Sequence, residues 1–286
     1  MNSLRCITAW LALLCLGSLP LLHGISQPVE KTGPASKPAC LGFDRNIFPG
    51  KAALPVLRKT FTFSGYWLSP PPGEKTNTWL GQRELLRAQG FGFLLLYRGP
   101  QTRELKNEAA VEKGIADARD AASAAKSEGF PMRSIIFLDI EEGGRLSATY
   151  HAYLRAWAGG LSEAGYRSGA YCSGIPVKEQ PSATITTADD IRAHAPSQDF
   201  VFYIFNDVCP PSPGCTFPQK PPSPMAGGVP DAGVWQFAQS PRRMERTVHC
   251  PPGYHSDGNC YAPGDTAHTW FLDVNSASSP DPSGGR

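Results

Sequence analysis

The sequence predicts an α/β fold, a closed (β/α)8 TIM barrel of regular or irregular form. Short apolar runs that end in polar or aromatic residues recur along the chain, and such runs are typical of strands buried on both faces. Helical patterns separate several of the runs, which indicates βαβ units. The 286 residues suffice for one barrel, since barrels of about 250 residues are common. The expected strands are 40–44, 60–67, 92–97, 134–141, 168–173, 200–206, 233–237 and 269–275.

Helices are expected in several intervals between these strands. The stretch 79–89 and the alanine-rich stretch 104–128 both carry helical patterns. Ser147 caps a helix whose apolar residues recur every three or four positions, and Gly165 fits just past its end. Thr187 opens a short helix, because the acidic residues after it favour the positive end of the helix dipole. An open doubly wound sheet is the alternative, but no glycine-rich phosphate turn follows the first strand.

Two segments, 209–231 and 239–268, interrupt the alternation of strands and helices with prolines, glycines and cysteines. Each follows an expected strand, so each is expected to be a disulfide-bearing insertion on the C-terminal face of the barrel. Barrel enzymes place their active sites on this face. The insertions are therefore expected to wall a cleft or to act as recognition loops.

The N-terminus predicts export. Arg5 precedes an apolar stretch at 7–22, and Gly24 and Ser26 occupy the small-residue positions of a cleavage site. A membrane anchor is the alternative, but it needs roughly 20 unbroken apolar residues. We therefore expect a secreted or periplasmic protein whose mature chain has no stable membrane span. The expected parts are a signal peptide at 1–26, a flexible leader at 27–39, the barrel at 40–276 and a disordered tail at 277–286.

The cysteines favour disulfides. Cys6 and Cys15 leave with the signal peptide, and an even number then remains, which in an exported chain indicates disulfide pairing. A zinc site is the alternative, but no C-x2-C pair is present, so no metal is expected. Short loops favour two of the pairs and leave the third by elimination. The expected pairs are Cys209–Cys215, Cys250–Cys260 and Cys40–Cys172.

Charge and motifs argue against several classes of function. The formal net charge of +2 gives no electrostatic case for nucleic-acid binding. No G-x-S-x-G elbow is present, so Ser-His-Asp catalysis is not favoured. His249, His255 and His268 lie among turn residues and are interpreted as surface residues. No cofactor is expected.

The strongest local signal is a pair of carboxylates after an apolar run. Residues 134–138 lead into Asp139 and Glu141, which point to the same side of a strand about 6.6 Å apart along the backbone. Like charge and partial burial raise at least one of the two pKa values, which gives a proton donor beside an ionised partner. Glycoside hydrolysis uses such a pair. The alternative is two ordinary carboxylates at a strand end, or a pair that binds a cation.

Further polar residues are expected at the same mouth. Asp44 ends the first expected strand and Asp273 lies near the end of the last, and these strands are neighbours in a closed barrel. Aromatic rings with amide or guanidinium donors suit the apolar faces and hydroxyl rims of sugars. For any single aromatic residue the alternative is core packing. The candidate substrate-binding residues are Tyr66, Trp67, Tyr97, Arg98, Tyr171, Tyr203, Asn206, Trp235 and Gln236.

Five short motifs carry a family resemblance. In chain order they are GFD at 42–44, FLDIE at 137–141, GAYCSG at 169–174, VWQF at 234–237 and LDVN at 272–275. Their joint order resembles that of family 25 glycoside hydrolases, the Chalaropsis-type lysozymes. The chain resembles still more a related group of secreted bacterial proteins with a glycoside-hydrolase-like domain of unknown function. The resemblance covers roughly residues 40 to 276.

The lysozyme resemblance implies a barrel that cleaves peptidoglycan between its two amino sugars. It implies that Glu141 is the general acid. Asp139 would orient or stabilise the charged intermediate, or assist the acetamido group of the substrate. Asp44 and Asp273 would position sugar and water. Trp235 with its neighbour at 236 would shape the floor of the site.

The chain departs from the lysozyme pattern at 68–73 and in the two cysteine-bearing insertions. These departures bear on the substrate more than on the barrel. The favoured hypothesis is a secreted glycosidase that acts on peptidoglycan or another extracellular glycan. The alternative is a glycan-binding or cell-envelope-associated protein that uses the same barrel without catalysis, because a fold does not fix a function.

Overall fold

The computed structural model describes residues 38–195, 199–206, 217–238, 262–266 and 270–286. The expected signal peptide lies outside the described residues, and so do both expected disulfides between cysteines 209 and 215 and between 250 and 260. The described residues belong to the unit Lys37–Arg286.

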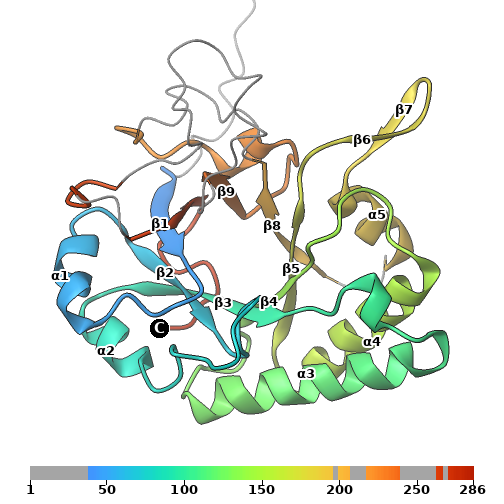
Figure 1. Ribbon diagram of the computed structural model, residues 1–286, viewed down its shortest axis with the longest axis horizontal. Coiled ribbons are helices and arrows are strands. Elements are labelled where there is room, and N and C mark those ends of the chain that lie inside the picture. Colours follow the sequence, from blue (N-terminus) through green and yellow to red (C-terminus); the bar gives the residue numbers. More distant parts are fainter. Residues whose placement is uncertain (1–37, 196–198, 207–216, 239–261, 267–269) are drawn as a thin grey trace, which may run out of the picture. The chain divides into compact units, whose positions relative to one another are not determined.

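Eight strands close into a barrel in the order β1-β10-β9-β8-β5-β4-β3-β2 (Figure 1). All of the expected strands are present, most of them with slightly different ends. Two further strands, β6 and β7, form a separate exposed hairpin. The strands are β1 Cys40–Asp44, β2 Phe63–Trp67, β3 Gly92–Arg98, β4 Ile135–Asp139, β5 Arg167–Ser173, β6 Val177–Gln180, β7 Ala183–Ile185, β8 Val201–Phe205, β9 Val234–Ala238 and β10 Asp273–Ala277.

Helices follow the first strands of the barrel and pack on its outside (Figure 1). Within the described part of the chain, no helix has both the length and the apolar character that crossing a membrane requires. The α-helices are α1 Leu54–Leu57, α2 Arg83–Ala88, α3 Ala110–Ser127, α4 Ala148–Glu163 and α5 Thr187–His194. Short 3-10 helices span Lys51–Ala53, Thr102–Glu104, Asn107–Ala109 and Pro224–Gly227.

The expected helix signals are met in part. The Ser147 side chain caps α4 by accepting a hydrogen bond from the amide of Tyr150, and Gly165 just beyond this helix has a φ of 83°. α5 begins at Thr187, as expected, and the Thr186 side chain caps it. α2 and α3 begin later than the predicted stretches do, because turns and 3-10 segments occupy their first residues.

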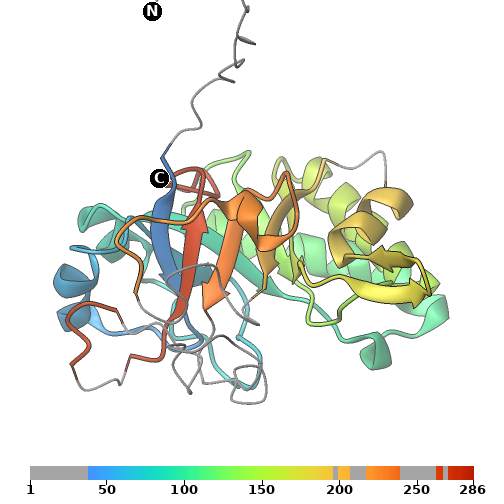
Figure 2. The same cartoon turned by 90° about the horizontal axis from the view of Figure 1, so that it is seen from above.

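The direction of the last strand corrects the expectation of an all-parallel barrel. β10 is antiparallel to both β1 and β9, whereas the other neighbouring pairs in the barrel are parallel. Figure 2 shows the red strand β10 running against the blue strand β1 beside it. Asp273 is therefore the first residue of its strand, and it pairs with Asp44, the last residue of β1. Both carboxylates still reach one mouth of the barrel.

Side chains fill the barrel below this mouth. The Phe63 ring occupies the space that a side chain at Gly42 would need, and the Phe137 ring does the same beside Gly169. Both rings are fully buried. Large residues opposite glycines give a close-packed interior, which confines any ligand site to the mouth.

The C-terminal segment is ordered and packs against the opposite end of the barrel, so the expectation of a disordered tail was wrong. Asp281 accepts a hydrogen bond from the amide of Phe93, and the Ser283 hydroxyl accepts one from the amide of Leu95, both at 2.8 Å. Gly285 lies against the Cβ atom of Phe93 and the ring of Phe130. The small polar residues that suggested disorder instead satisfy backbone groups at the start of the sheet.

The expected Cys40–Cys172 disulfide is not formed, and both thiols are free. Cys40 lies on β1, between β10 and β2, whereas Cys172 lies on β5, between β4 and β8. Side chains alternate between the two faces of a strand, so Cys172 points away from the barrel interior that the neighbouring Tyr171 faces. The barrel wall therefore separates the two sulfurs.

Candidate functional site

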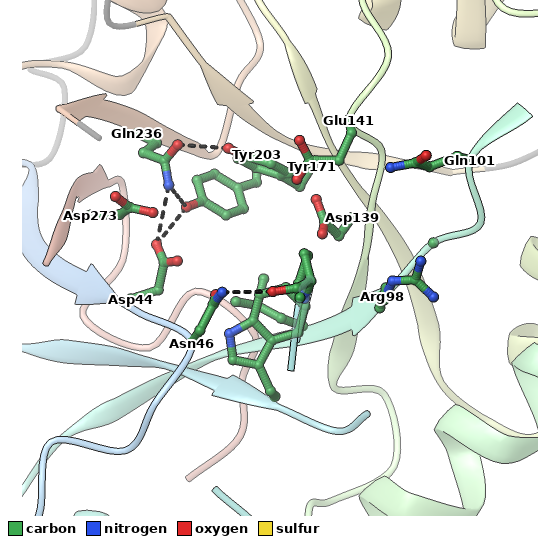
Figure 3. A pocket seen from close by; sticks show the side chains of 15 residues that line it. Asp44, Asn46, Arg98, Gln101, Asp139, Glu141, Tyr171, Tyr203, Gln236 and Asp273 are labelled. Atoms are coloured by element: carbon green, nitrogen blue, oxygen red, sulfur yellow. Dashed lines mark hydrogen bonds between the residues drawn. The ribbon is translucent and has the colours of Figure 1, made fainter. Parts of the chain in front are cut away.

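A cavity of about 360 Å³ opens at the mouth where the parallel strands end (Figure 3). Its size is in the range of small-ligand sites. The lining comes from the last residues of several strands and from the loops that follow them. The lining residues are Asp44, Asn46, Trp67, Pro72, Gly73, Leu96, Arg98, Gly99, Gln101, Asp139, Glu141, Tyr171, Tyr203, Gln236 and Asp273.

The cavity contains all four carboxylates that were expected to be catalytic, Asp44, Asp139, Glu141 and Asp273. Glycine backbone makes this convergence sterically possible: a side chain at Gly65 on β2 would collide with Asp44. Of the expected substrate-binding residues, five also line the cavity. They are Trp67, Arg98, Tyr171, Tyr203 and Gln236.

Four expected substrate-binding residues lie outside this cavity. The Tyr66 hydroxyl donates to Glu128 on the outside of the barrel, and the Tyr97 hydroxyl donates to Asp120 on α3 at 2.9 Å. The indole N–H of Trp235 donates to the carbonyl of Asn206 at 3.2 Å, and Trp235 is core rather than floor. Tyr66, Tyr97 and Trp235 alternate with lining residues along their strands, so their side chains face the other side of the barrel wall. The fourth residue, Asn206, follows the end of β8. Tyr97 lines a second, adjacent cavity.

Asp44 is held by a dense set of hydrogen bonds. Its Oδ2 lies 2.8 Å from the Tyr203 hydroxyl oxygen and accepts a hydrogen bond from the Asn275 amide at 2.7 Å. The Gln236 amide lies 3.5 Å from the same oxygen and 3.2 Å from the Tyr203 hydroxyl (Figure 3). Burial raises the pKa of Asp44, and the hydrogen bonds from Asn275, Tyr203 and Gln236 act against that rise.

Asp139 is equally buried but differently surrounded. Its Oδ1 has no hydrogen-bond partner within the described residues. Burial raises the pKa of Asp139 well above its ordinary value, the charges of Glu141 and Asp44 add to the rise, and the charge of Arg98 acts against it. The expectation that one carboxyl of the pair has a raised pKa is therefore met at Asp139. Glu141 itself is exposed at the opening.

Two loops carry the rim of the cavity, and hydrogen bonds join them. Glu104 lies 3.1 Å from the Arg98 guanidinium and accepts a hydrogen bond from the amide of Gln101 at 2.9 Å. Glu142 accepts from both the amide and the hydroxyl of Thr102, at 2.6 and 2.8 Å. The loop after β3 is thus tied to the loop after β4, on which Glu141 lies.

Three polar residues of the site were not predicted from the sequence. Asn46 and Gln101 line the cavity from loops, and no periodic pattern marks a loop residue that faces a cavity. Asn275 binds Asp44 from β10. Its position two residues after Asp273, on the same face of one strand, is the signal that could have identified it.

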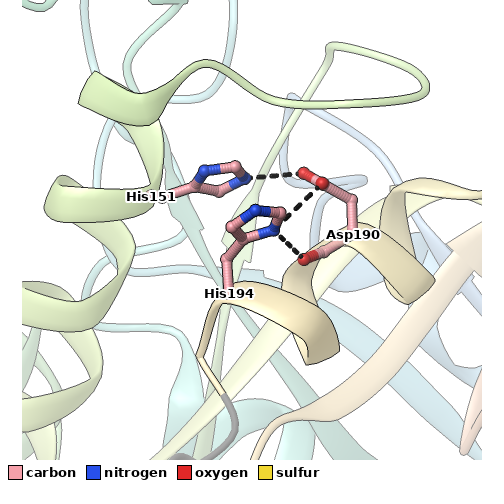
Figure 4. A group of neighbouring side chains, drawn as sticks. All are labelled: His151, Asp190 and His194. Carbon is pink, nitrogen blue, oxygen red and sulfur yellow. Dashed lines mark hydrogen bonds and ion pairs between the residues drawn. The ribbon is translucent and has the colours of Figure 1, made fainter.

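Outside the cavity, His151, Asp190 and His194 form the one cluster within the described residues whose potential metal ligands converge, all within 4.8 Å (Figure 4). The two imidazole rings are stacked, with centroids 3.8 Å apart and planes at 7°. An imidazole binds a metal in its own ring plane, so two parallel rings do not share one ion. His151 lies 2.7 Å and Arg145 3.2 Å from the Asp190 carboxylate, which fits a hydrogen-bonded support between α4 and α5.

Comparison with known proteins gives relatives of the fold. No curated protein matches the sequence. An uncharacterised protein of B. stearothermophilus is 18% identical, with a TM-score of 0.51 over 83% of this chain and 95% of that one. The Tat-secreted protein Rv2525c of Mycobacterium tuberculosis, in complex with L-tartrate, is 14% identical, with a TM-score of 0.50 over 86% of this chain and 97% of that one. At these identities the likeness concerns the fold alone.

A third structure is the catalytic domain of endolysin ply40 from bacteriophage P40 of Listeria monocytogenes. It is 17% identical, with a TM-score of 0.45 over 86% of this chain and 96% of that one. A family model matches the chain between β2 and β8, the part that contains the Asp139 and Glu141 loop. Residues 64–205 match the model of the Rv2525c-like, glycoside hydrolase-like domain.

Proposed function

We propose that the protein is a glycosidase that hydrolyses an extracellular glycan, with peptidoglycan as the favoured substrate. The observation that carries the proposal is the pairing of a bare, buried carboxyl, Asp139, with an exposed carboxyl, Glu141, in one cavity. Hydrolysis of a glycosidic bond needs a proton donor and a carboxylate that faces the developing positive charge.

The roles follow from the two environments. Burial and the charges of Glu141 and Asp44 raise the pKa of Asp139, so Asp139 holds a proton in the free site. When the substrate binds, this proton passes from Asp139 to Glu141, which lies at the opening and donates it to the oxygen of the leaving sugar. The Asp139 carboxylate then faces the positively charged sugar, whose charge offsets the cost of ionising a buried group.

An amino-sugar substrate is favoured by two unsatisfied atoms. Within the described residues, the indole N–H of Trp67 and Oδ1 of Asp139 are buried without hydrogen-bond partners. One is a donor and the other an acceptor, and both residues line the cavity. An acetamido group offers a carbonyl and an N–H in one planar unit, which are the groups complementary to this donor and this acceptor. The expected export signal and a glycan of the cell envelope are consistent with each other.

A binding role without catalysis is the second candidate. Within the described residues, no hydrogen bond or ion pair fixes the Glu141 carboxylate, whereas a general acid is normally held in one orientation. A protein of this kind would bind the glycan through Asp44, Asp139 and Trp67 and leave it intact.

The test separates the two roles on the same samples. Mature protein and its Glu141→Gln variant are incubated with purified peptidoglycan and with oligomers of N-acetylglucosamine, and both bound protein and new reducing ends are measured. A glycosidase produces reducing ends in the wild type and none in the variant. Binding by both proteins with no reducing ends supports the second candidate, and neither binding nor cleavage by the folded wild type contradicts both.

A further inference from the structure

Three buried side chains from three strands close a ring of short contacts beneath the cavity. Asp44 of β1 contacts Tyr203 of β8 at 2.8 Å, and Tyr203 contacts Asn275 of β10 at 2.9 Å. Asn275 returns to Asp44 at 2.7 Å. All three residues are at most 5% exposed.

The number of hydrogens in this ring depends on the charge of Asp44. The Tyr203 hydroxyl has one hydrogen, but it contacts two oxygens, Oδ2 of Asp44 and Oδ1 of Asn275. The Asn275 amide N–H contacts Asp44, and an ionised Asp44 requires this orientation, since the reversed amide would set its oxygen against a carboxylate oxygen. An ionised Asp44 would therefore leave one of the two oxygen–oxygen contacts without a hydrogen.

We propose that Asp44 is a neutral carboxylic acid in the free protein, with its proton on Oδ2 and donated to Tyr203. The Tyr203 hydroxyl then donates to Asn275, and the Asn275 amide donates back to Asp44. Every contact in the ring contains one hydrogen, and hydrogen bonds that run in one direction reinforce each other. The Gln236 amide, 3.2 Å from the Tyr203 oxygen, fits this arrangement because that oxygen is then an acceptor.

The charges around the ring disfavour a further anion at Asp44. Asp273 is its partner in the β1–β10 register, and Asp139 and Glu141 line the same cavity. Arg98 is the cationic side chain in the described lining, and its charge lowers the pKa of Asp139. Burial raises the pKa of Asp44, which agrees with the hydrogen count.

A neutral Asp44 changes what the cavity offers a ligand. Figure 3 shows the second carboxyl oxygen of Asp44 outside the network and toward the cavity. This oxygen is an uncharged acceptor for a hydroxyl or N–H group of the ligand. Tyr203 and Asn275 are positioning residues, because they keep the proton on the oxygen that faces away from the ligand. The inference is independent of whether the protein cleaves glycans.

The test measures the proton without substrate. Infrared spectra of protein with isotope-labelled aspartate are recorded across pH in an Asp139→Asn background, which removes the other buried acid of the cavity. The C=O band of a protonated carboxyl that disappears when Asp44→Asn is added belongs to Asp44. We expect this band at neutral pH, and its absence there overturns the proposal.

Tyr203→Phe in the same background gives a second test, in which the direction of the pH shift of the C=O band decides between the two hydrogen-bond directions. The midpoint is the pH at which half of the band has disappeared. If the Asp44 proton is donated to Tyr203, loss of the hydroxyl moves this midpoint to lower pH. If Tyr203 instead donates to an ionised Asp44, loss of the donor moves the midpoint to higher pH and contradicts the proposal. Tyr166→Phe is the matched control, because the Tyr166 hydroxyl binds the Phe130 carbonyl away from the cavity, and it should leave the midpoint unchanged.

Discussion

Asp44 and Asp139 are two carboxyl groups of one cavity with the same burial and opposite surroundings. Asp44 is 5% exposed and Asp139 is 4% exposed. Three side chains contact one oxygen of Asp44, whereas one oxygen of Asp139 has no partner within the described residues. Burial alone therefore does not define a reactive group. Hydrogen bonds from neighbouring side chains hold Asp44, whereas Asp139 remains available to a ligand.

The unsatisfied oxygen of Asp139 lowers the stability of the folded state. A buried polar atom without a partner destabilises a protein by about 1–3 kcal/mol, and the cost is larger for a charged group. Folded chains retain such atoms chiefly where function requires them. Among the described residues, Asp139 and Trp67 have such an atom and line the cavity, whereas Arg83, Trp157 and Ser276 have one elsewhere.

The largest expected effect is on turnover. Glu141→Gln removes the proton donor, and we expect glycan hydrolysis to fall by about 10²–10⁴-fold, the usual contribution of a positioned acid. The melting temperature should not change, because Glu141 is exposed. Glu163→Gln, an exposed residue at the end of α4, is the control and should retain full activity. Equal rates for the Glu141 variant and the wild type would remove this residue from the mechanism.

The next effect is on stability and concerns Asp44 and the side chains that hydrogen-bond to it. Asn275→Ala leaves both Asp44 and Tyr203 short of a partner, so the free energy of unfolding should fall by about 1–3 kcal/mol. Urea denaturation measures the loss. Gln101→Ala at the half-buried rim is the comparison variant and should change stability much less. A fully stable Asn275 variant would show that the ring contributes little.

The pH dependence of stability tests Asp139, the carboxyl group with the unsatisfied oxygen. The pKa of Asp139 is raised on folding, so between its ordinary and raised values the folded chain binds more protons than the unfolded chain. The free energy of unfolding should therefore fall as pH rises through this window. Asp139→Asn should flatten that decline and stabilise the protein at neutral pH. Asp199→Asn, with a side chain 87% exposed, should leave the wild-type slope, and an identical slope in both variants would refute the assignment.

The smallest expected effect separates two adjacent aromatic residues of β2. Trp67→Phe keeps a ring in the cavity but removes the unsatisfied N–H, so glycan affinity should fall by roughly tenfold, about 1.4 kcal/mol. Tyr66→Phe changes the outside of the barrel and should leave affinity unchanged. Calorimetric titration compares the two, and equal losses would mean that the alternation of faces does not select ligand contacts.

These two residues also show how far the sequence predicts the site. The apolar runs located every barrel strand, because burial on both faces leaves a continuous hydrophobic signal. The same continuity hides which face is inside, so Tyr66 and Trp67 were equally good candidates. The carboxylates were less ambiguous: Asp44, Asp139, Glu141 and Asp273 all line the cavity.

Strand direction and chain ends were harder to predict. A hydrophobic run has no direction, so nothing before Asp273 indicated that β10 returns antiparallel to β1. The composition of the C-terminal segment resembled a disordered tail, yet Asp281 and Ser283 bind amides at the start of β3. Such contacts join residues that are far apart in the chain, and local composition does not reveal them.

The different roles of Asp139 and Asp44 are measured by reducing-end release from purified peptidoglycan with the wild type, Asp139→Asn and Asp44→Asn. We expect turnover by the wild type, loss of turnover in Asp139→Asn, and a much smaller loss in Asp44→Asn, since a neutral amide resembles a neutral acid. Full turnover by Asp139→Asn, or losses of equal size in both variants, would overturn the proposed roles of the two carboxyl groups.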